Sequence, residues 1–384
     1  MSTSLLIGAS VVLALSSGFK SEAQSSGGTP AVARDLHLRG DSWSIPKFEL
    51  GNSKPKAGVF QQNLDHFGAH VGSDRGPTFS QRYWVNSDFV TNPATAPILF
   101  HICGESDAEQ GYYLNDNTLE WAKALGAHVV YLEHRFYGQS LPFPDTSTTH
   151  LTSLTLPNVI EDLATFQIWL TQNKGWNGKW IAIGGSYSGT LSAIYRLRHP
   201  ELVVGALAAS APLFSGLGLA EGTQSDVDDM SSIDPANSDR QWVWQACTSL
   251  GIWEADGPSI QSNTLYPSPW LCGQLFPQAP TYNSSAFDQS FAVPFLAKAT
   301  APASNVLFTY GTDDVWTKLG LVGHGKLAAR INLLVIQGAG HHFDLNSPDS
   351  TDSAAVKAAR QEFLTLARSW LNITTTKSWN SPLY

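Results

Sequence analysis

The chain has 384 residues, of which 42% are hydrophobic and 14% are charged, and its formal net charge is −9. This composition excludes a disordered chain, and the length suits one large domain or two ordinary ones. The acidic balance disfavours nucleic acid as a partner, because phosphates attract basic surfaces. The sequence has no P-loop, dinucleotide fingerprint, zincin pattern or clustered Cys/His spacing. We therefore expect neither a cofactor nor a metal site.

The first segment of the chain has the features of a targeting signal. Residues 5–16 form an apolar run that is too short to span a membrane, and small residues follow near Ala23. We expect a signal peptide at 1–23, a flexible leader at 24–50, and secretion or delivery to a lysosome or vacuole. No later apolar segment has the length of a transmembrane helix, so no membrane span is expected.

Strands and helices alternate through the rest of the chain. We predict strands near 59–64, 81–85, 98–102, 128–133, 180–183, 305–310 and 331–336, and helices near 119–125, 159–170, 191–199 and 354–371. Alternation of this kind predicts an α/β fold with one mostly parallel sheet and helices on both of its faces.

The hexapeptide Gly-Gly-Ser-Tyr-Ser-Gly at 184–189 lies between a predicted strand and a predicted helix. A strand, a sharp turn and a helix are the setting of a nucleophile elbow, which makes Ser186 the candidate nucleophile. Ser188 stands where the usual G-x-S-x-G pattern has glycine, and a residue as small as serine is tolerated there. The alternative is a Gly/Ser turn that caps an ordinary helix.

The last two predicted strands lead into the segments T-D-D-V-W and G-A-G-H-H-F-D. An α/β hydrolase places its acid and its histidine on loops after late strands, in the chain order Ser, Asp, His. Ser186, Asp314 and His341 satisfy this order. The imidazole would take the serine proton, and the carboxylate would fix the imidazole tautomer. From the residues alone, Asp313 competes equally with Asp314, and His342 with His341.

Several segments resemble the family of serine carboxypeptidases and dipeptidyl peptidases that cleave after proline. They are Q-Q-N-L-D-H-F at 61–67, F-S-Q-R-Y-W-V-N at 79–86, E-H-R-F-Y-G-Q-S at 133–140, the hexapeptide at 184–189, V-V-G-A-L-A-A-S-A-P at 203–212, R-Q-W-V-W-Q-A-C at 240–247 and the histidine loop at 338–345. The resemblance implies an α/β-hydrolase fold. It also implies a secreted serine-type peptidase that hydrolyses proline-containing peptides through an acyl-enzyme.

The resemblance also implies roles for individual residues. The acid of the family is the aspartate two positions before a tryptophan, here Asp314, and its histidine is the first of the H-H pair, here His341. The oxyanion hole would be formed by the backbone N–H groups of Tyr187 and Gly104. The loop that carries Gly104 departs from the family pattern by having Cys103 in front of it.

Three side chains are candidates for substrate binding. Glu105 follows the expected oxyanion loop and could pair with a substrate amine. Trp242 and Trp244 either line an apolar pocket for a proline ring or fill the core of the cap, and the sequence favours neither. For the charged run at 133–135 we favour a structural ion-pair network over substrate contact.

Between Pro212 and Arg240 the chain departs from the family, whose members carry a long helical cap there. We predict hydrolase segments at 51–212 and 301–384 with a reduced cap insertion at 213–300. This difference fits either a short form with an open site or an incomplete version of a longer gene product.

Passage through a secretory pathway would permit a disulfide. Of the three cysteines, Cys247 and Cys272 lie together in the reduced cap and are the expected pair, which leaves Cys103 as the single thiol. Asn283 and Asn372 begin N-x-S/T glycosylation sequences. Two other functions stay open: an esterase or lipase with the same triad, and a silent α/β-hydrolase domain that binds a partner. The sequence leaves the oligomeric state undetermined.

Overall fold

The computed structural model describes residues 55–68, 76–109, 116–219, 232–236, 238–255, 272–273, 275–277, 279, 287–300 and 302–373. The expected signal peptide, the leader and the glycosylation acceptor Asn283 lie outside these residues. Asn372 lies within them and is exposed at the C-terminal end of the last helix.

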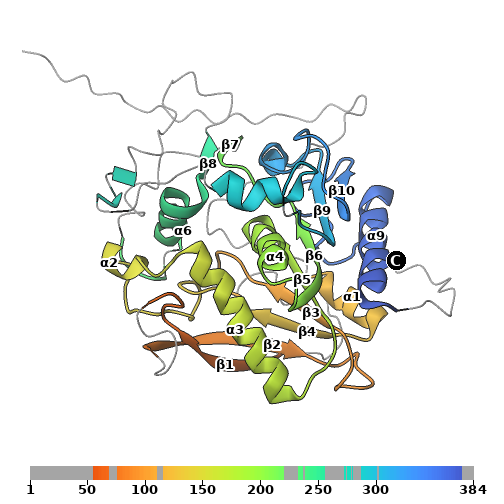
Figure 1. The fold of residues 1–384 in the computed structure, drawn as a ribbon, viewed down its shortest axis with the longest axis horizontal. Coiled ribbons are helices and arrows are strands. Elements are labelled where there is room, and N and C mark those ends of the chain that lie inside the picture. Colours follow the sequence, from red (N-terminus) through yellow and green to blue (C-terminus); the bar gives the residue numbers. More distant parts are fainter. Residues whose placement is uncertain are drawn as a thin grey trace, which may run out of the picture. The chain divides into compact units, whose positions relative to one another are not determined.

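The main sheet has eight strands in the order β1-β2-β4-β3-β5-β6-β9-β10 (Figure 1). The strands are β1 (Lys56–Asn63), β2 (Thr78–Asn86), β3 (Ile98–Ile102), β4 (His128–Leu132), β5 (Trp180–Gly185), β6 (Val203–Ala209), β9 (Val306–Gly311) and β10 (Ile331–Ile336). From β4 to β10 all neighbouring pairs are parallel, whereas β2 is antiparallel to both β1 and β4. The sequence-based prediction of a mostly parallel α/β sheet is confirmed.

The central strands are buried on both faces, and their side chains alternate between two apolar cores. On β3, Phe100 faces one core and Leu99 the other, and on β9 Phe308 and Leu307 divide in the same way. Each core therefore needs its own layer of helices.

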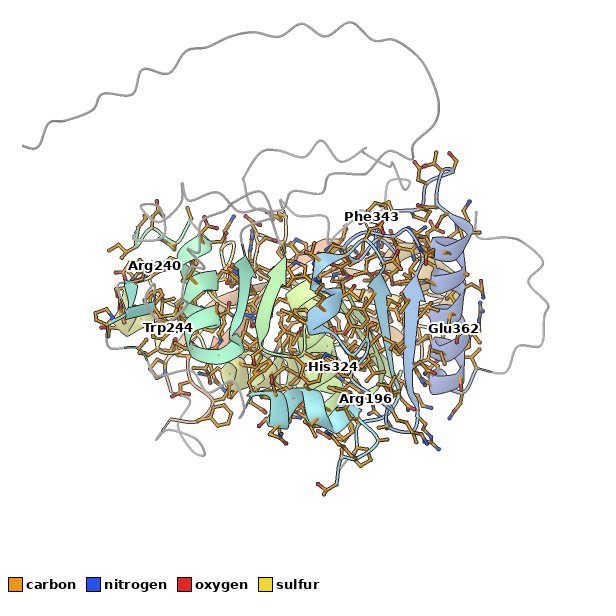
Figure 2. All side chains as sticks on the ribbon, turned by 90° about the horizontal axis from the view of Figure 1, so that it is seen from above. Arg196, Arg240, Trp244, His324, Phe343 and Glu362 are labelled. Atoms are coloured by element: carbon orange, nitrogen blue, oxygen red, sulfur yellow. A yellow bond between two sulfur atoms is a disulfide. The ribbon has the colours of Figure 1, made fainter. Side chains whose placement is uncertain are left out.

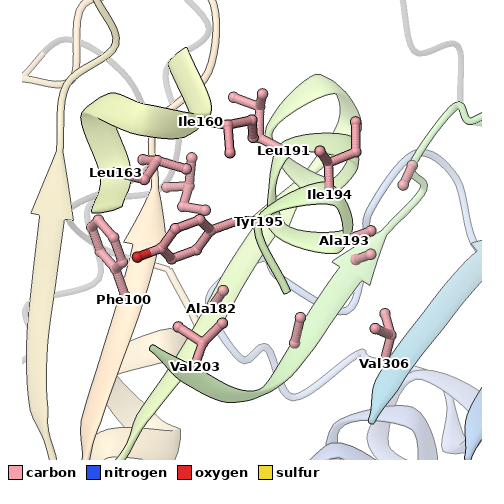
Figure 3. Packing of buried hydrophobic residues seen from close by; sticks show 14 of the residues in the cluster. Phe100, Ile160, Leu163, Ala182, Leu191, Ala193, Ile194, Tyr195, Val203 and Val306 are labelled. Carbon is pink, nitrogen blue, oxygen red and sulfur yellow. The ribbon is translucent and has the colours of Figure 1, made fainter. Parts of the chain in front are cut away.

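The first core is covered by α3 (Leu156–Lys174) and α4 (Ser186–Arg198), and the second by α1 (Thr118–Leu125) and α9 (Ala354–Leu371). Figure 3 shows Tyr195 and Leu191 of α4 beside Ile160 and Leu163 of α3, above Phe100 of the sheet. The long helices have the expected end signals. The Thr155 and Ser353 side chains cap α3 and α9, and α3 ends at a left-handed glycine.

Ion pairs at the end of β4 join the antiparallel strands to the rest of the domain. Glu133 is buried and pairs with Arg82 of β2 through contacts of 2.5 and 2.8 Å. Arg135 is also buried and makes two bonds of 2.6 Å to Asp162 of α3. These charged side chains satisfy one another, as the structural alternative for residues 133–135 requires.

The chain between β6 and β9 forms the insertion. Its described part contains β7 (Gly216–Leu219), which pairs in parallel with β8 (Ile252–Ala255), and the helix α6 (Asp239–Gln245). Short helical turns follow at Ala246–Leu250, Asp288–Ala292 and Val293–Phe295. A disulfide joins Cys247 to Cys272. Figure 2 shows Trp244 and Arg240 on α6, with the sheet between that helix and Glu362 of α9.

The turn from β5 into α4 places Ser186 at a backbone φ of +57°, in the left-handed region that side chains seldom adopt. Close packing around it explains the neighbouring glycines. A Cβ on Gly184 would lie 2.2 Å from the carbonyl oxygen of Ser188, and one on Gly189 would lie 2.8 Å from that of Ala209. The Ser188 hydroxyl donates to the Gly185 carbonyl at 2.7 Å and accepts from the Gly185 N–H at 3.1 Å. These two bonds join Ser188 to Gly185 and stabilise the tight turn that carries Ser186.

We predict that Ser188→Ala lowers the free energy of unfolding by about 1–3 kcal/mol, because two hydrogen bonds to buried backbone groups are lost. Ser192→Ala is the matched control. Ser192 is equally buried, but its hydroxyl only adds a bond to a carbonyl of its own helix, that of Ser188, at 2.9 Å. Chemical denaturation of both variants measures the difference. Equal losses would show that Ser188 has no special role in the elbow.

Candidate active site

The residues singled out for catalysis all follow the C-terminal ends of parallel strands. Gly104 and Glu105 follow β3, Ser186 follows β5, Asp314 follows β9 and His341 follows β10. Because these strands are parallel and close in the sheet order, their C-terminal ends meet at one edge. This edge is where open α/β sheets form their binding sites.

The loop that carries the two histidines packs directly on the elbow. A Cβ added to Gly185 would lie 3.1 Å from Cγ of His342 and 2.7 Å from Cδ1 of Leu345. A side chain before the serine would therefore have to displace part of the histidine loop. The backbone N–H of His342 also donates to the Ser210 hydroxyl at 2.8 Å, which ties the loop to the end of β6. Ser186 itself is partly exposed.

His341 and Asp314 form the polar pair of the site. Nδ1 of His341 lies 2.9 Å from Oδ1 of Asp314, and the Asp314 side chain has no exposed surface. The same carboxylate oxygen accepts the N–H of Trp316 at 3.0 Å, which fixes its orientation. Since an ionised carboxylate can only accept, the proton lies on Nδ1, and the Nε2 atom of a neutral ring can take a proton.

Asp313 and His342, the alternatives to Asp314 and His341 that the sequence leaves open, have different surroundings. Asp313 is exposed, and its carboxylate accepts a bond from the Thr312 hydroxyl at 3.1 Å. His342 is buried, with a ring centroid 4.6 Å from that of His341. Of the four combinations that the sequence allows, the structure brings together Asp314 and His341.

Arg360 of α9, which the sequence analysis did not single out, supports the histidine loop. Its guanidinium is fully buried and donates to the carbonyls of Phe343, Asp344 and Asn346 at 2.9–3.2 Å. An ion pair of 2.5 Å with Asp352 compensates its charge. The signal in the sequence was an arginine at a position of α9 that the helical period assigns to the buried face.

Asp344 anchors the same loop to β9. It is buried, and its Oδ2 accepts the Thr309 hydroxyl at 2.7 Å. Burial is the largest cause that raises the pKa of this carboxyl group, and the nearby charge of Asp314 adds to the effect. Because a carboxyl group with a raised pKa is more easily protonated, Asp344 repels the nearby Asp314 carboxylate less than an ordinary aspartate would.

The expected oxyanion donors follow two neighbouring strands, β3 and β5. Tyr187 is the second residue of α4, so its N–H belongs to the first turn, where helical N–H groups have no partner within the helix. Gly104 is buried just beyond β3. Cys103 is buried as well, and burial raises the pKa of its thiol well above the ordinary value, as expected for an inert cysteine.

The three expected substrate-binding side chains differ in exposure. Glu105 is partly buried, close enough to His341 for their charges to interact, and burial raises the pKa of its carboxyl group. Trp242 is partly exposed, and its ring lies edge-on to Tyr187 with centroids 5.7 Å apart. Trp244 is 1% exposed and donates its indole N–H to the Leu154 carbonyl at 3.1 Å. Trp244 therefore fills the core of the insertion, whereas Trp242 borders the elbow.

Within the described residues, no group of three His, Cys, Asp or Glu side chains is arranged to hold a metal ion. None of the helices in that part of the chain has the length and apolar character needed to cross a membrane.

Two of the curated proteins that this chain resembles are named as peptidases. The thymus-specific serine protease of Mus musculus is 40% identical over 173 residues, which cover 44% of this chain and 33% of that protein. The lysosomal Pro-X carboxypeptidase of Homo sapiens is 39% identical over 186 residues, which cover 47% of this chain and 36% of that protein. Each alignment thus spans about a third of the relative's length. Among solved structures, one chain from a structural analysis of two fungal esterases of Rhizomucor miehei is similar, at 14% identity and a TM-score of 0.46 over 84% of both chains.

The sequence profile of the family described as serine carboxypeptidase S28 matches residues 62–224 and 219–363. The two matched segments overlap at 219–224, inside the stretch 213–239 where a shortened cap is expected from the sequence. Together they cover most of the chain, including the elbow, the acid loop and the histidine loop. The chain has the α/β-hydrolase fold and belongs to the serine carboxypeptidase S28 family.

Proposed function

We propose that this chain is a serine-type peptidase in which Ser186 is the nucleophile, His341 the general base and Asp314 the acid that orients it. The observation that carries the proposal is the 2.9 Å bond between His341 and the fully buried carboxylate of Asp314. That pair lies at the same sheet edge as the left-handed Ser186.

In the proposed reaction, the Ser186 oxygen attacks the scissile carbonyl carbon while its proton moves to Nε2 of His341. The charge that develops on the carbonyl oxygen is stabilised by the N–H groups of Tyr187 and Gly104. Collapse of the tetrahedral intermediate breaks the C–N bond, and His341 returns the proton to the leaving amine. Water then hydrolyses the acyl-enzyme by the same steps.

Two further parts of the proposal concern substrate and compartment. A preference for proline before the cleaved bond is supported by the relative named Pro-X carboxypeptidase. The partly exposed Trp242 offers an apolar surface beside the elbow. A secreted or lysosomal location is supported by the Cys247–Cys272 disulfide, because disulfides form in oxidising compartments, and by the lysosomal relative.

Substitutions at the triad test the assignment. Ser186→Ala should reduce turnover on the order of 10⁴-fold or more, because triad members act as a unit. Asp314→Asn and His341→Ala should also cripple acyl transfer. Asp313→Asn and His342→Ala are the matched controls and should keep most of the activity. Steady-state kinetics on a panel of proline peptides and short acyl esters measures both turnover and substrate class.

Two outcomes of that panel would contradict the proposal. An equal loss of activity in Asp313→Asn and Asp314→Asn would contradict the assignment of the acid. An equal loss in His341→Ala and His342→Ala would contradict that of the base. Rapid hydrolysis of esters without cleavage of any proline peptide would instead identify an esterase that uses the same site.

The reduced insertion predicts weak control over substrate length. An exopeptidase covers its site and places a charge to meet the end of the substrate, and residues 213–239 offer little chain to build such a cover. We expect cleavage of proline-containing peptides internally as well as near an end. Mass spectrometry of digests of end-blocked and free peptides measures this. A strict need for a free terminus would contradict the prediction.

From the position and raised pKa of Glu105 we predict a pH-dependent preference for substrates with a free amine near the cleaved bond. Burial raises the pKa of its carboxyl group, so the carboxylate becomes neutral at a higher pH than an ordinary glutamate. As pH falls, the ratio of kcat/KM for free and blocked peptides should therefore decrease toward one. In Glu105→Gln the ratio of kcat/KM for free and blocked peptides should be small and independent of pH. An unchanged ratio in this variant would show that Glu105 does not meet the amine.

A further inference from the structure

A continuous chain of hydrogen bonds runs between the insertion and the residue that follows the nucleophile. The Tyr137 hydroxyl lies 2.6 Å from Oε1 of Gln245, and Nε2 of Gln245 lies 2.6 Å from the Tyr187 hydroxyl. The Tyr187 hydroxyl lies 3.1 Å from Nε2 of His134, whose Nδ1 lies 2.6 Å from the carbonyl of Arg135. All four linked side chains are at most 4% exposed.

The direction of every bond in this chain follows from chemistry. The Arg135 carbonyl can only accept, so Nδ1 of His134 carries a proton. Burial lowers the pKa of His134 to about 4, so the ring is neutral near pH 7. The bare Nε2 atom must then accept the O–H of Tyr187. The Tyr187 oxygen accepts in turn from the amide of Gln245, and the Gln245 carbonyl accepts from Tyr137.

Rotating the Gln245 amide by half a turn would exchange its carbonyl and its NH2 group and so reverse these donor and acceptor roles. Its carbonyl would then face the Tyr187 hydroxyl and require the tyrosine proton. Nε2 of His134 would have to donate, which gives a doubly protonated ring in a site where burial disfavours charge. A neutral His134 therefore allows a single arrangement, and Tyr187 is held from two sides by fixed partners.

The insertion contributes one of those partners through the last residue of α6. Other side chains of α6 bond to the segment after β4: Gln241 to the Phe136 carbonyl at 3.2 Å and Arg240 to the Thr146 carbonyl at 2.8 Å. In the part of the chain that the structure describes, Gln245 is the residue of α6 that hydrogen-bonds to Tyr187, while Trp242 packs against the tyrosine ring. Gln241 and Arg240 thus dock α6 without reaching Tyr187, whereas Gln245 bonds both to Tyr137 of that segment and to Tyr187.

We propose that Gln245 is a positioning residue, which fixes the side chain of Tyr187 and thereby holds its backbone N–H in place to stabilise the oxyanion. The inference rests on the proposed function. The proposal gives α6, a helix of the insertion, the role of supporting the elbow. Gln245 acts through Tyr187 and not on the substrate.

Variants of the two buried glutamines of α6 test this role. Gln245→Leu roughly keeps the volume and removes the bonds to both Tyr187 and Tyr137. We expect kcat to fall about tenfold to hundredfold with little change in KM, because the interaction with the oxyanion is made only in the transition state. Gln241→Leu removes bonds that dock the same helix but do not reach Tyr187, and its kcat should stay close to that of the wild type.

Tyr187→Phe removes one hydroxyl and should give a similar loss of kcat. The double variant should lose little more than either single variant, because both changes break the same link. Should Gln245→Leu fail to fold, Tyr187→Phe still gives the readout. Affinity for a peptide boronate, which forms a tetrahedral adduct with serine, should fall in step with kcat.

The outcomes separate this inference from the proposed function. An active wild type with an unchanged kcat in Gln245→Leu would overturn the positioning role alone. A loss in Gln241→Leu as large as that in Gln245→Leu would also overturn it, by showing that α6 acts through packing. A purified, folded wild type that cleaves none of the peptide or ester substrates would overturn the proposed function and the positioning role together.

Discussion

The left-handed backbone of Ser186 is the constraint on which the rest of the site depends. It turns the chain within one residue from a buried strand into a buried helix. The turn requires glycine at 184, where backbone atoms occupy the space of a Cβ, and side chains of the histidine loop pack closely on Gly185. One of those side chains is that of His342, so the packing that allows the turn also brings the histidine loop to the serine. The elbow is therefore packed directly against the loop that carries His341.

Supporting interactions converge on this turn from several directions. Ser188 closes it from within α4, Arg360 holds the histidine loop from α9, and Gln245 reaches Tyr187 from the insertion. Each support is buried and uses hydrogen bonds whose donors and acceptors are satisfied by backbone or side-chain partners. Such a site is ordered before substrate binds, which is the condition for effective electrostatic stabilisation of a transition state.

The sequence predicts the parts of this architecture that are local. Alternating strands and helices, the elbow and the order of acid and histidine all depend on short stretches of chain. Seven of the eight strands of the main sheet lie close to predicted ones, whereas β6 of that sheet and the strands β7 and β8 were not predicted. Long-range pairings are not predictable in this way. Gln245 and Tyr187 are 58 positions apart, and nothing in their neighbourhoods indicates that they meet. Likewise, only the burial of Trp244 separates its role from that of Trp242.

The central claim is that Ser186 is an activated nucleophile, and covalent labelling tests it most directly. A fluorophosphonate probe reacts with a serine that a neighbouring base has activated. The labelled protein can be digested and the modified residue identified by mass spectrometry. The account predicts a single adduct on Ser186, which is lost in His341→Ala. An adduct on Ser188, or no adduct on folded protein, would contradict it.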